Sequence, residues 1–217
     1  MPVFTSRLTQ KNDMTSRNIQ LVLASQSPRR SQLLADSGFD FIVSPPDDSV
    51  ERSVDPNCLP EDLVLESALA KARAIAPKFE TALVLAADTV AQCDDQVLGK
   101  PVDRDHAERM LRLMSGRSHQ VLTGICLWHR PSDHRLCRVD RTVLNMDPLS
   151  ETQLESILDS NGWIGKAGGF GYQDGLDWLH IEAGLESNVV GLPVEHLDQW
   201  MEELLNSIDS DECNFQI

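Results

Sequence analysis

The sequence lacks any hydrophobic run long enough to cross a bilayer, although 41% of its 217 residues are hydrophobic. A membrane-spanning helix needs about 20 apolar residues in succession, whereas the apolar runs here are short, as at 21–24 and 83–87. Residues 1–18 are polar and basic and lead into no apolar stretch of the kind that forms a secretory signal. We therefore expect no membrane partner, and we expect a flexible leader over residues 1–18 in preference to a transit peptide.

The sequence also lacks cysteines paired as C-x-x-C, so none of its five cysteines indicates a zinc site. An odd number of scattered cysteines is typical of reduced thiols in a cytosol, and we expect a cytoplasmic protein. Cys126 and Cys137 are spaced so that they can face one another across a hairpin, where the reduced pair is again favoured.

A surplus of positive charge is missing as well. The 34 acidic residues outnumber the 19 lysines and arginines and give a formal net charge of −15. Such a charge repels a phosphate backbone, so a nucleic acid polymer is not expected as a partner. Against this acidic background, the adjacent Arg29 and Arg30 indicate a local site for a small anion.

The apolar residues alternate between strand-like and helix-like spacing, which predicts a mixed α/β fold. Asp103 is placed to cap one helix, and Ser150 with Gln153 forms a capping-box pattern at the start of another. We expect a single domain over residues 19–206 and an acidic tail over 207–217. The expected strands are 19–24, 39–43, 81–87, 121–128, 136–146 and 178–182, and the expected helices are 29–37, 60–76, 103–114, 150–159 and 193–206.

The first candidate site lies where strand 19–24 leads into a helix. The N–H groups at the start of a helix favour a bound phosphate. The hydroxyls of Ser25 and Ser27 and the guanidiniums of Arg29 and Arg30 would add hydrogen-bond donors. The alternative is an ordinary helix cap with two solvated arginines, which Ser-Pro-Arg-Arg alone fits at least as well. The glycines and lysine of a Walker loop are absent.

The second candidate is Asp88, with Thr89 beside it, at the expected carboxyl end of strand 81–87. Ligands of open α/β sheets usually bind beyond the carboxyl ends of strands. A carboxylate there can hold Mg²⁺ or orient a water for attack on phosphorus. The alternative is an aspartate that merely ends the strand and starts a turn. Val90 stands where a phosphatase with an aspartyl nucleophile would have the second Asp of D-x-D, which argues against that mechanism.

Two lysines and a glycine-rich loop are further candidates. Lys71 lies in an alanine-rich stretch whose small side chains give it little cover, and Lys100 lies in a rigid turn before Pro101. Each ammonium suits a triphosphate, although a single lysine is more typical of the surface. In loop 165–171 the glycines allow close backbone approach to a planar ligand, and Gln173 is placed to read a base edge. A flexible glycine turn is the alternative.

Seven strings in order resemble the Maf (septum-formation inhibitor-like) nucleotide pyrophosphatases. The resemblance covers about residues 19–205. The strings are S-Q-S-P-R-R at 25–30, L-A-K-A at 69–72, A-D-T at 87–89, G-K-P at 99–101, S-G-R-S-H-Q-V-L-T-G at 115–124, K-A-G-G-F-G-Y-Q at 166–173 and N-V-V-G-L-P at 188–193.

The resemblance implies a central twisted sheet flanked by helices and split by a cleft between two lobes. The family's fold is related in shape to that of inosine triphosphate pyrophosphatases, and family members often form homodimers. It implies Asp88 as the catalytic carboxylate, with Lys71 and Lys100 among the groups around the phosphates, together with Ser25 and Arg30. A divalent cation, Mg²⁺ or in its place Mn²⁺ or Co²⁺, is expected on Asp88 and a second carboxylate. Our alignment favours Asp48 for this second ligand, with Glu51 as the rival.

The expected activity is hydrolysis of a nucleoside triphosphate to the monophosphate and pyrophosphate. Arg30, Thr89 and Gln173 match positions that mark the dTTP/UTP-cleaving branch, which favours dTTP, UTP or a modified pyrimidine nucleotide. The glycine loop begins Gly165-Lys166 where the family usually has Asp-Lys, which bears on the branch more than on the activity. The main alternative is a nucleotide-binding regulator of cell division that hydrolyses nothing. A general phosphatase would instead release inorganic phosphate.

Overall fold

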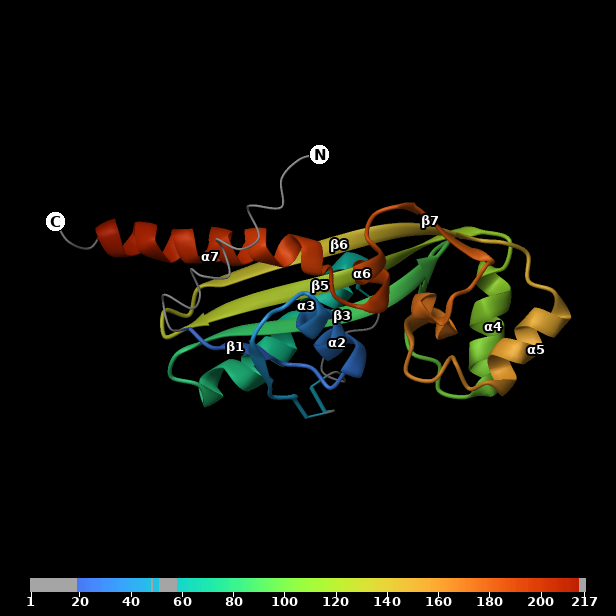
Figure 1. Cartoon of the computed structure of the whole chain (residues 1–217), viewed down its shortest axis with the longest axis horizontal. Helices are drawn as coiled ribbons and strands as arrows, with labels where there is room; N and C mark the ends of the chain where they lie inside the picture. Colours follow the sequence, from blue (N-terminus) through green and yellow to red (C-terminus); the bar gives the residue numbers. More distant parts are fainter. Residues whose placement is uncertain (1–18, 48, 51–57, 215–217) are drawn as a thin grey trace.

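A computed structural model describes residues 19–47, 49–50 and 58–214 (Figure 1). Within them a mixed sheet of seven strands has the order β2-β1-β3-β5-β6-β7, and β4 pairs with β3. The β1–β2 and β1–β3 pairs are parallel, and the other pairs are antiparallel. The strands are β1 (Leu21–Leu23), β2 (Phe41–Val43), β3 (Ala82–Cys93), β4 (Gln96–Leu98), β5 (Ser118–Arg130), β6 (Arg135–Met146) and β7 (Leu179–Ala183).

Helices cover both faces of the sheet and form two lobes along the long strands β3, β5 and β6 (Figure 1). The larger lobe holds α2, α3 and α7, and the smaller lobe holds α4 and α5. This arrangement confirms the expected fold class. The helical elements are α2 (Pro28–Asp36), α3 (Pro60–Ile75), α4 (Arg104–Met114), α5 (Glu151–Asp159), α6 (Glu186–Val190), α7 (Val194–Asn214) and the 3₁₀ turns η2 (Ala76–Lys78), η3 (Ala167–Gly169) and η4 (Tyr172–Asp174).

The continuous apolar run of β3 is buried on both faces, as such runs are in parallel sheets. Because neighbouring residues of a strand point to opposite faces, Leu83 and Leu85 join one core with α2 and α7. Val84 and Ala86 join another core beneath α3. A third cluster fills the smaller lobe between α4, α5 and the far ends of the long strands.

The strand expected to end at residue 87 continues to Cys93, so Asp88 lies within β3 rather than at its end. It is opposite Gly124 in an unbroken antiparallel ladder with β5. Burial changes at this point, since Asp88 and Thr89 are half-buried after six fully buried residues. The polar residues therefore mark where the sheet opens to a cavity and not where the strand stops.

Other element ends also differ from expectation. The helix expected to end at Asn206 continues to Asn214, which makes residues 207–214 of the expected tail helical. The physical reason is that Ile208 extends the apolar face of α7 and is buried in the core with Leu204. The short β4 and α6 were not expected. No helix in the described ranges has both the length and the apolar character that a membrane span needs.

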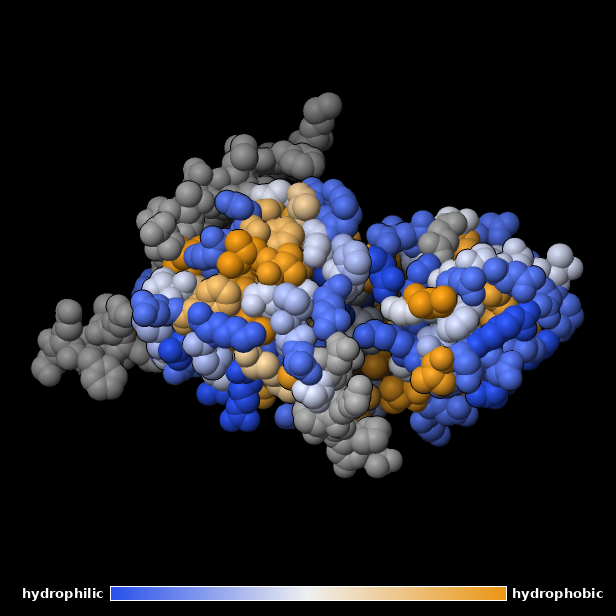
Figure 2. Space-filling model, turned by 90° about the horizontal axis from the view of Figure 1, so that it is seen from below, coloured by the Kyte–Doolittle hydropathy of each residue, from blue (hydrophilic) through white to orange (hydrophobic). Residues whose placement is uncertain are grey.

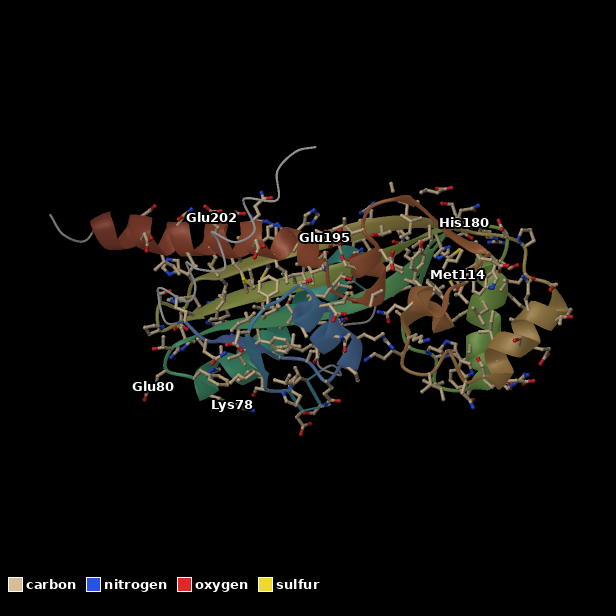
Figure 3. The ribbon with its side chains drawn as sticks, in the orientation of Figure 1. Lys78, Glu80, Met114, His180, Glu195 and Glu202 are labelled. Atoms are coloured by element: carbon tan, nitrogen blue, oxygen red, sulfur yellow. The ribbon has the colours of Figure 1, made fainter. Side chains whose placement is uncertain are left out.

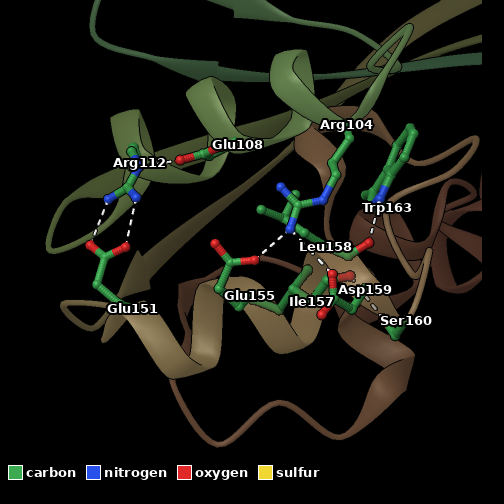
Figure 4. A network of polar contacts seen from close by, with 10 residues as sticks. All are labelled: Arg104, Glu108, Arg112, Glu151, Glu155, Ile157, Leu158, Asp159, Ser160 and Trp163. Atoms are coloured by element: carbon green, nitrogen blue, oxygen red, sulfur yellow. Dashed lines mark hydrogen bonds and ion pairs between the residues drawn. The ribbon is translucent and has the colours of Figure 1, made fainter.

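Both expected caps of the smaller lobe are present. The side chain of Asp103 accepts a hydrogen bond from the His106 backbone, and Ser150 forms the capping box with Gln153. Two arginines of α4 bind acidic residues of α5 across the lobe surface (Figure 4). These ion pairs are exposed and therefore contribute little to stability, and the two helices also share the apolar core of the smaller lobe. The ion pairs join Arg112 to Glu151 and Arg104 to Glu155 and Asp159.

Helix α3 lies so close to the sheet that a side chain at Gly124 has no room. A Cβ built there would be 2.2 Å from the carbonyl oxygen of Val64 in α3. We expect Gly124→Ala to push α3 outward and to lower the free energy of unfolding by about 1–3 kcal/mol or more, as overpacking does. Denaturant unfolding measures this loss. Gly99→Ala is the control, because a Cβ there meets nothing within 4 Å, and equal stability of the two variants would contradict the close approach.

Candidate active site

A cavity of about 640 Å³ lies between the two lobes and opens to the surface. Figure 2 shows the hollow between the lobes from below. Segments far apart in the sequence line it, namely the start of α2, the middle of β3 and the loop that contains η3 and η4. The cavity brings together the described residues that the sequence marked as candidates: Ser25, Ser27, Arg29, Arg30, Lys71, Asp88, Thr89, Lys100 and Gln173.

The charge of the cavity is opposite to that of the chain. Among the described residues, five basic and two acidic side chains line it, although the whole chain carries a formal charge of −15. Exposed acids such as Glu80 and Glu202 lie on the outside of the larger lobe (Figure 3). The cavity is therefore a local site for an anion. The basic residues are Arg29, Arg30, Lys71, Lys100 and Lys166, and the acidic residues are Asp47 and Asp88.

Lys71 and Asp88 form an ion pair at the bottom of this site. The Nζ of Lys71 is 2.6 Å from Oδ1 of Asp88, and their side chains are 4% and 18% exposed. Lys71 also donates to the backbone oxygen of Ala87 at 3.4 Å. The expectation that small neighbours leave Lys71 uncovered is wrong. Small residues instead let α3 pack closely on the sheet, which buries the lysine between them.

Arg30 is buried and joins three elements around the cavity. Its Nε donates to the Gly191 oxygen at 2.7 Å, and its two terminal nitrogens donate to Thr89 Oγ1 at 2.9 Å and Ser25 Oγ at 3.3 Å. The alternative of a solvated arginine is therefore wrong for Arg30. Its guanidinium is held rigidly at the wall where α2 meets β3.

Asp88 and Thr89 point to opposite faces of β3 because they are consecutive in a strand. Asp88 turns toward α3, whereas Thr89 meets Thr123 of β5 at 3.0 Å between the two hydroxyl oxygens. Thr123 in turn donates to the backbone oxygen of Asn188 in α6 at 3.2 Å. Our residue-by-residue reading missed Thr123 and Asn188, although both lie in the strings at 115–124 and 188–193.

The remaining candidates line the rim. Ser25 Oγ accepts a hydrogen bond from the Ser27 backbone N–H at 3.1 Å, which shapes the start of α2. Arg29 reaches across the cavity and donates to the Gly165 oxygen at 2.8 Å, so it links the two lobes. Lys166, which the sequence reading did not select, also lines the cavity.

Gln173 lines the cavity from η4, and Phe170 and Tyr172 of the same loop line it as well. Asp48 and Glu51, the two alternatives for a second metal ligand, lie outside the described residues. The described part of the chain contains no group of three or more His, Cys, Asp or Glu side chains that could hold a metal by themselves. Asp47 and Asp88 are the carboxylates that it places in the cavity.

A family model described as Maf-like protein matches residues 20–204, which includes every described residue of this cavity. The chain belongs to the Maf-like family. It is 50% identical to a dTTP/UTP pyrophosphatase of Rhodopirellula baltica over 183 residues, 84% of this chain and 81% of that protein. It is 42% identical to a dTTP/UTP pyrophosphatase of Symbiobacterium thermophilum over 183 residues, 84% of this chain and 92% of that protein.

A solved structure of a HAM1 protein from Coxiella burnetii has a similar fold. Its TM-score is 0.50 at 16% sequence identity, and the match covers 85% of this chain and 99% of that one. At this identity the likeness concerns the fold alone. It agrees with the expected α/β fold class.

Lys71 and Asp88 should stabilise the fold only when both charges are present. We expect Lys71→Met to lower the free energy of unfolding by about 1–3 kcal/mol, less than for a fully buried pair because Asp88 is partly solvated. Adding Asp88→Asn should recover most of the loss, since no unpaired carboxylate remains. Denaturant unfolding of both single variants and the double variant gives the coupling energy.

The matched control for this cycle is Lys78→Met, an exposed lysine on the outside of the larger lobe (Figure 3). Its change should stay within about 0.5 kcal/mol. Strictly additive effects of Lys71→Met and Asp88→Asn would show that the two charges do not stabilise one another.

Proposed function

We propose that this protein is a nucleoside triphosphate pyrophosphatase that hydrolyses dTTP, UTP or a modified pyrimidine nucleotide to the monophosphate and pyrophosphate. The observation that carries the proposal is a positively lined cavity in an acidic protein, with the carboxylate of Asp88 at its base. The names of the relatives that are 50% and 42% identical support the same substrates. A volume of about 640 Å³ is in the usual range for small-molecule sites.

The substrate would lie across the cavity from one lobe to the other. Its phosphates would meet three cations that line the cavity, namely Arg29 and Arg30 at the start of α2 and Lys100 in the turn after β4. Its base would lie toward Gln173, where the amide can donate and accept hydrogen bonds to a base edge. Tyr172 lines the cavity beside it.

A divalent cation fits the residues present. Mg²⁺ in such sites is usually held by one or two carboxylates together with substrate phosphates. The carboxylates of Asp47 and Asp88 line the cavity. The described residues contain no group of three or more His, Cys, Asp or Glu side chains that could hold a metal, so substrate phosphates would complete the coordination. We assign Asp88 and Asp48 as the protein ligands, with Glu51 as the alternative to Asp48. When bound, the cation would offset phosphate charge and polarise the α-phosphoryl group, and Mn²⁺ or Co²⁺ can take its place.

The protein's own groups account for the remaining steps. Lys71 holds Oδ1 of Asp88 and so fixes the orientation of the carboxylate. Asp88 orients a water and accepts its proton as the water oxygen bonds to the α-phosphorus. The bond from the α-phosphorus to the bridging oxygen breaks, and pyrophosphate leaves. Ser25, Arg30 and Lys100 stabilise the charge that develops on this leaving group.

Replacing Asp88 by Asn keeps the shape of the side chain and removes its charge. We expect kcat for dTTP and UTP to fall by about 10²–10⁴-fold, the usual contribution of a general base. The assay quantifies monophosphate and pyrophosphate together over a panel of ordinary and modified triphosphates. Asp62→Asn, an exposed aspartate on α3, is the control and should keep full activity.

The products also distinguish the competing functions. Equal amounts of monophosphate and pyrophosphate are expected from the unmodified protein. Inorganic phosphate as the direct product would indicate a general phosphatase. Thermal stabilisation by triphosphate without turnover would indicate a regulator that only binds nucleotide.

Removal of the divalent cation should stop turnover without unfolding the protein. EDTA is expected to abolish pyrophosphate release, and excess Mg²⁺ should restore it. The melting temperature should not change with EDTA alone, because the described residues contain no cluster that holds a metal by itself. Full activity in EDTA would contradict the role assigned to the cation.

A further inference from the structure

The long strands β5 and β6 are neighbours in the sheet (Figure 1). Their pairing places two cysteines side by side. Cys126 is directly opposite Cys137 in the antiparallel ladder, as the sequence led us to expect. Opposed residues in such ladders have Cα atoms about 4.5–5.5 Å apart, and disulfides span about 4.4–6.8 Å between Cα atoms. A bond between the sulfurs therefore requires little movement of the backbone.

The two thiols have different surroundings. Cys126 is fully buried in the core beneath α3, with Ala68 and Ala72 in the same cluster. Cys137 packs against the edge of that cluster and is partly exposed. A small oxidant can therefore reach Cys137 from solvent, while Cys126 lies behind it.

The charges around the pair favour a thiolate on Cys137. The facing Cys126 thiol, with Arg135 and Arg138, lowers the pKa of Cys137 to about 7, against the opposing effects of burial and Glu66. Arg135 is held on this face by stacking over the Trp128 ring at 4.2 Å. The interaction with Cys137, together with burial, raises the pKa of Cys126. At neutral pH one sulfur is thus a nucleophile, and the other keeps its proton.

We propose that Cys126 and Cys137 form a redox-active dithiol that a hydroperoxide converts reversibly into an intramolecular disulfide. This inference does not rest on the proposed function. It agrees with a reduced pair as the resting state, because the oxidant is needed to form the bond.

The reaction balances with a hydroperoxide as the sole oxidant. The Cys137 thiolate attacks the terminal peroxide oxygen, the O–O bond breaks, and the alcohol (water, for hydrogen peroxide) leaves after taking up a proton. Cys137 is now a sulfenic acid. The Cys126 sulfur displaces its hydroxyl, which leaves as water with the Cys126 proton, and the S–S bond forms. Two thiols lose two electrons in total, the peroxide gains them, and an external dithiol reverses the change by exchange.

The other described cysteines provide matched comparisons. Cys93 is buried, and burial together with the nearby Asp94 raises the pKa of its thiol. Cys58 is partly exposed, as Cys137 is, but it precedes α3 and is not part of the β5–β6 ladder. Exposure alone therefore does not distinguish Cys137 from Cys58, whereas the Cys126 thiol opposite Cys137 does.

The test treats the full chain with hydrogen peroxide at neutral pH and maps thiols and cross-links by peptide mass spectrometry. We expect a disulfide joining Cys126 to Cys137 that dithiothreitol removes. Oxidation at Cys137 should be at least ~10-fold faster than at Cys93, because the thiolate fraction is larger. Cys58→Ser should form the same cross-link at the same rate.

Two further variants separate the roles of the two sulfurs. Cys126→Ala should stop at a sulfenic acid on Cys137, which dimedone traps, and Cys137→Ser should leave Cys126 unreacted. The cross-link in the unmodified chain needs no variant, so the proposal stays testable if either substitution unfolds the protein. Oxidation without a Cys126–Cys137 cross-link, or equal reactivity of Cys137 and Cys93, would overturn the proposal.

Discussion

The site depends on one interaction, the ion pair between Lys71 and Asp88 with 2.6 Å between nitrogen and oxygen. Two charges withdrawn from water stabilise a structure only when each has its partner in good geometry. That geometry requires α3 to lie almost against the sheet. It does so because Gly124 has no side chain opposite Val64. Because Gly124 of β5 has no side chain, α3 lies close enough to the sheet for its Lys71 to reach Asp88 of β3.

A second wall is built around the buried guanidinium of Arg30. Hydrogen bonds tie it to Ser25, Thr89 and the Gly191 backbone, and Thr89 is held in turn by Thr123. Since Asp88 and Thr89 are neighbours on one strand, the two walls share a single rigid backbone. Rigid placement of charges where a reaction develops charge is the usual source of electrostatic catalysis. The chain as a whole is acidic, whereas basic side chains outnumber acidic ones in the cavity, so the cavity attracts anions locally.

Much of this could be predicted from the sequence, because local patterns carry it. The apolar run of β3, the caps at Asp103 and Ser150, and a shared site for the candidates at the start of α2 and on β3 were expected, and the structure contains them. The burial of Lys71 was not expected, because it depends on Gly124, which is more than fifty residues away in the sequence but contacts α3 in the fold. The continuation of β3 past Asp88 was missed for a similar reason, since a polar residue ends an apolar pattern without ending the pairing with β5.

The central claim is that Asp88 and Arg30 bind the same triphosphate from two walls of one cavity. A crystal structure with Mg²⁺ and a uridine triphosphate analogue whose α,β-bridging oxygen is replaced by NH tests it directly. The account predicts the α-phosphorus beside Asp88, the β- and γ-phosphates toward Arg30 and Lys100, and the base toward Gln173. A triphosphate bound outside this cavity, or bound with its α-phosphorus away from Asp88, would contradict it.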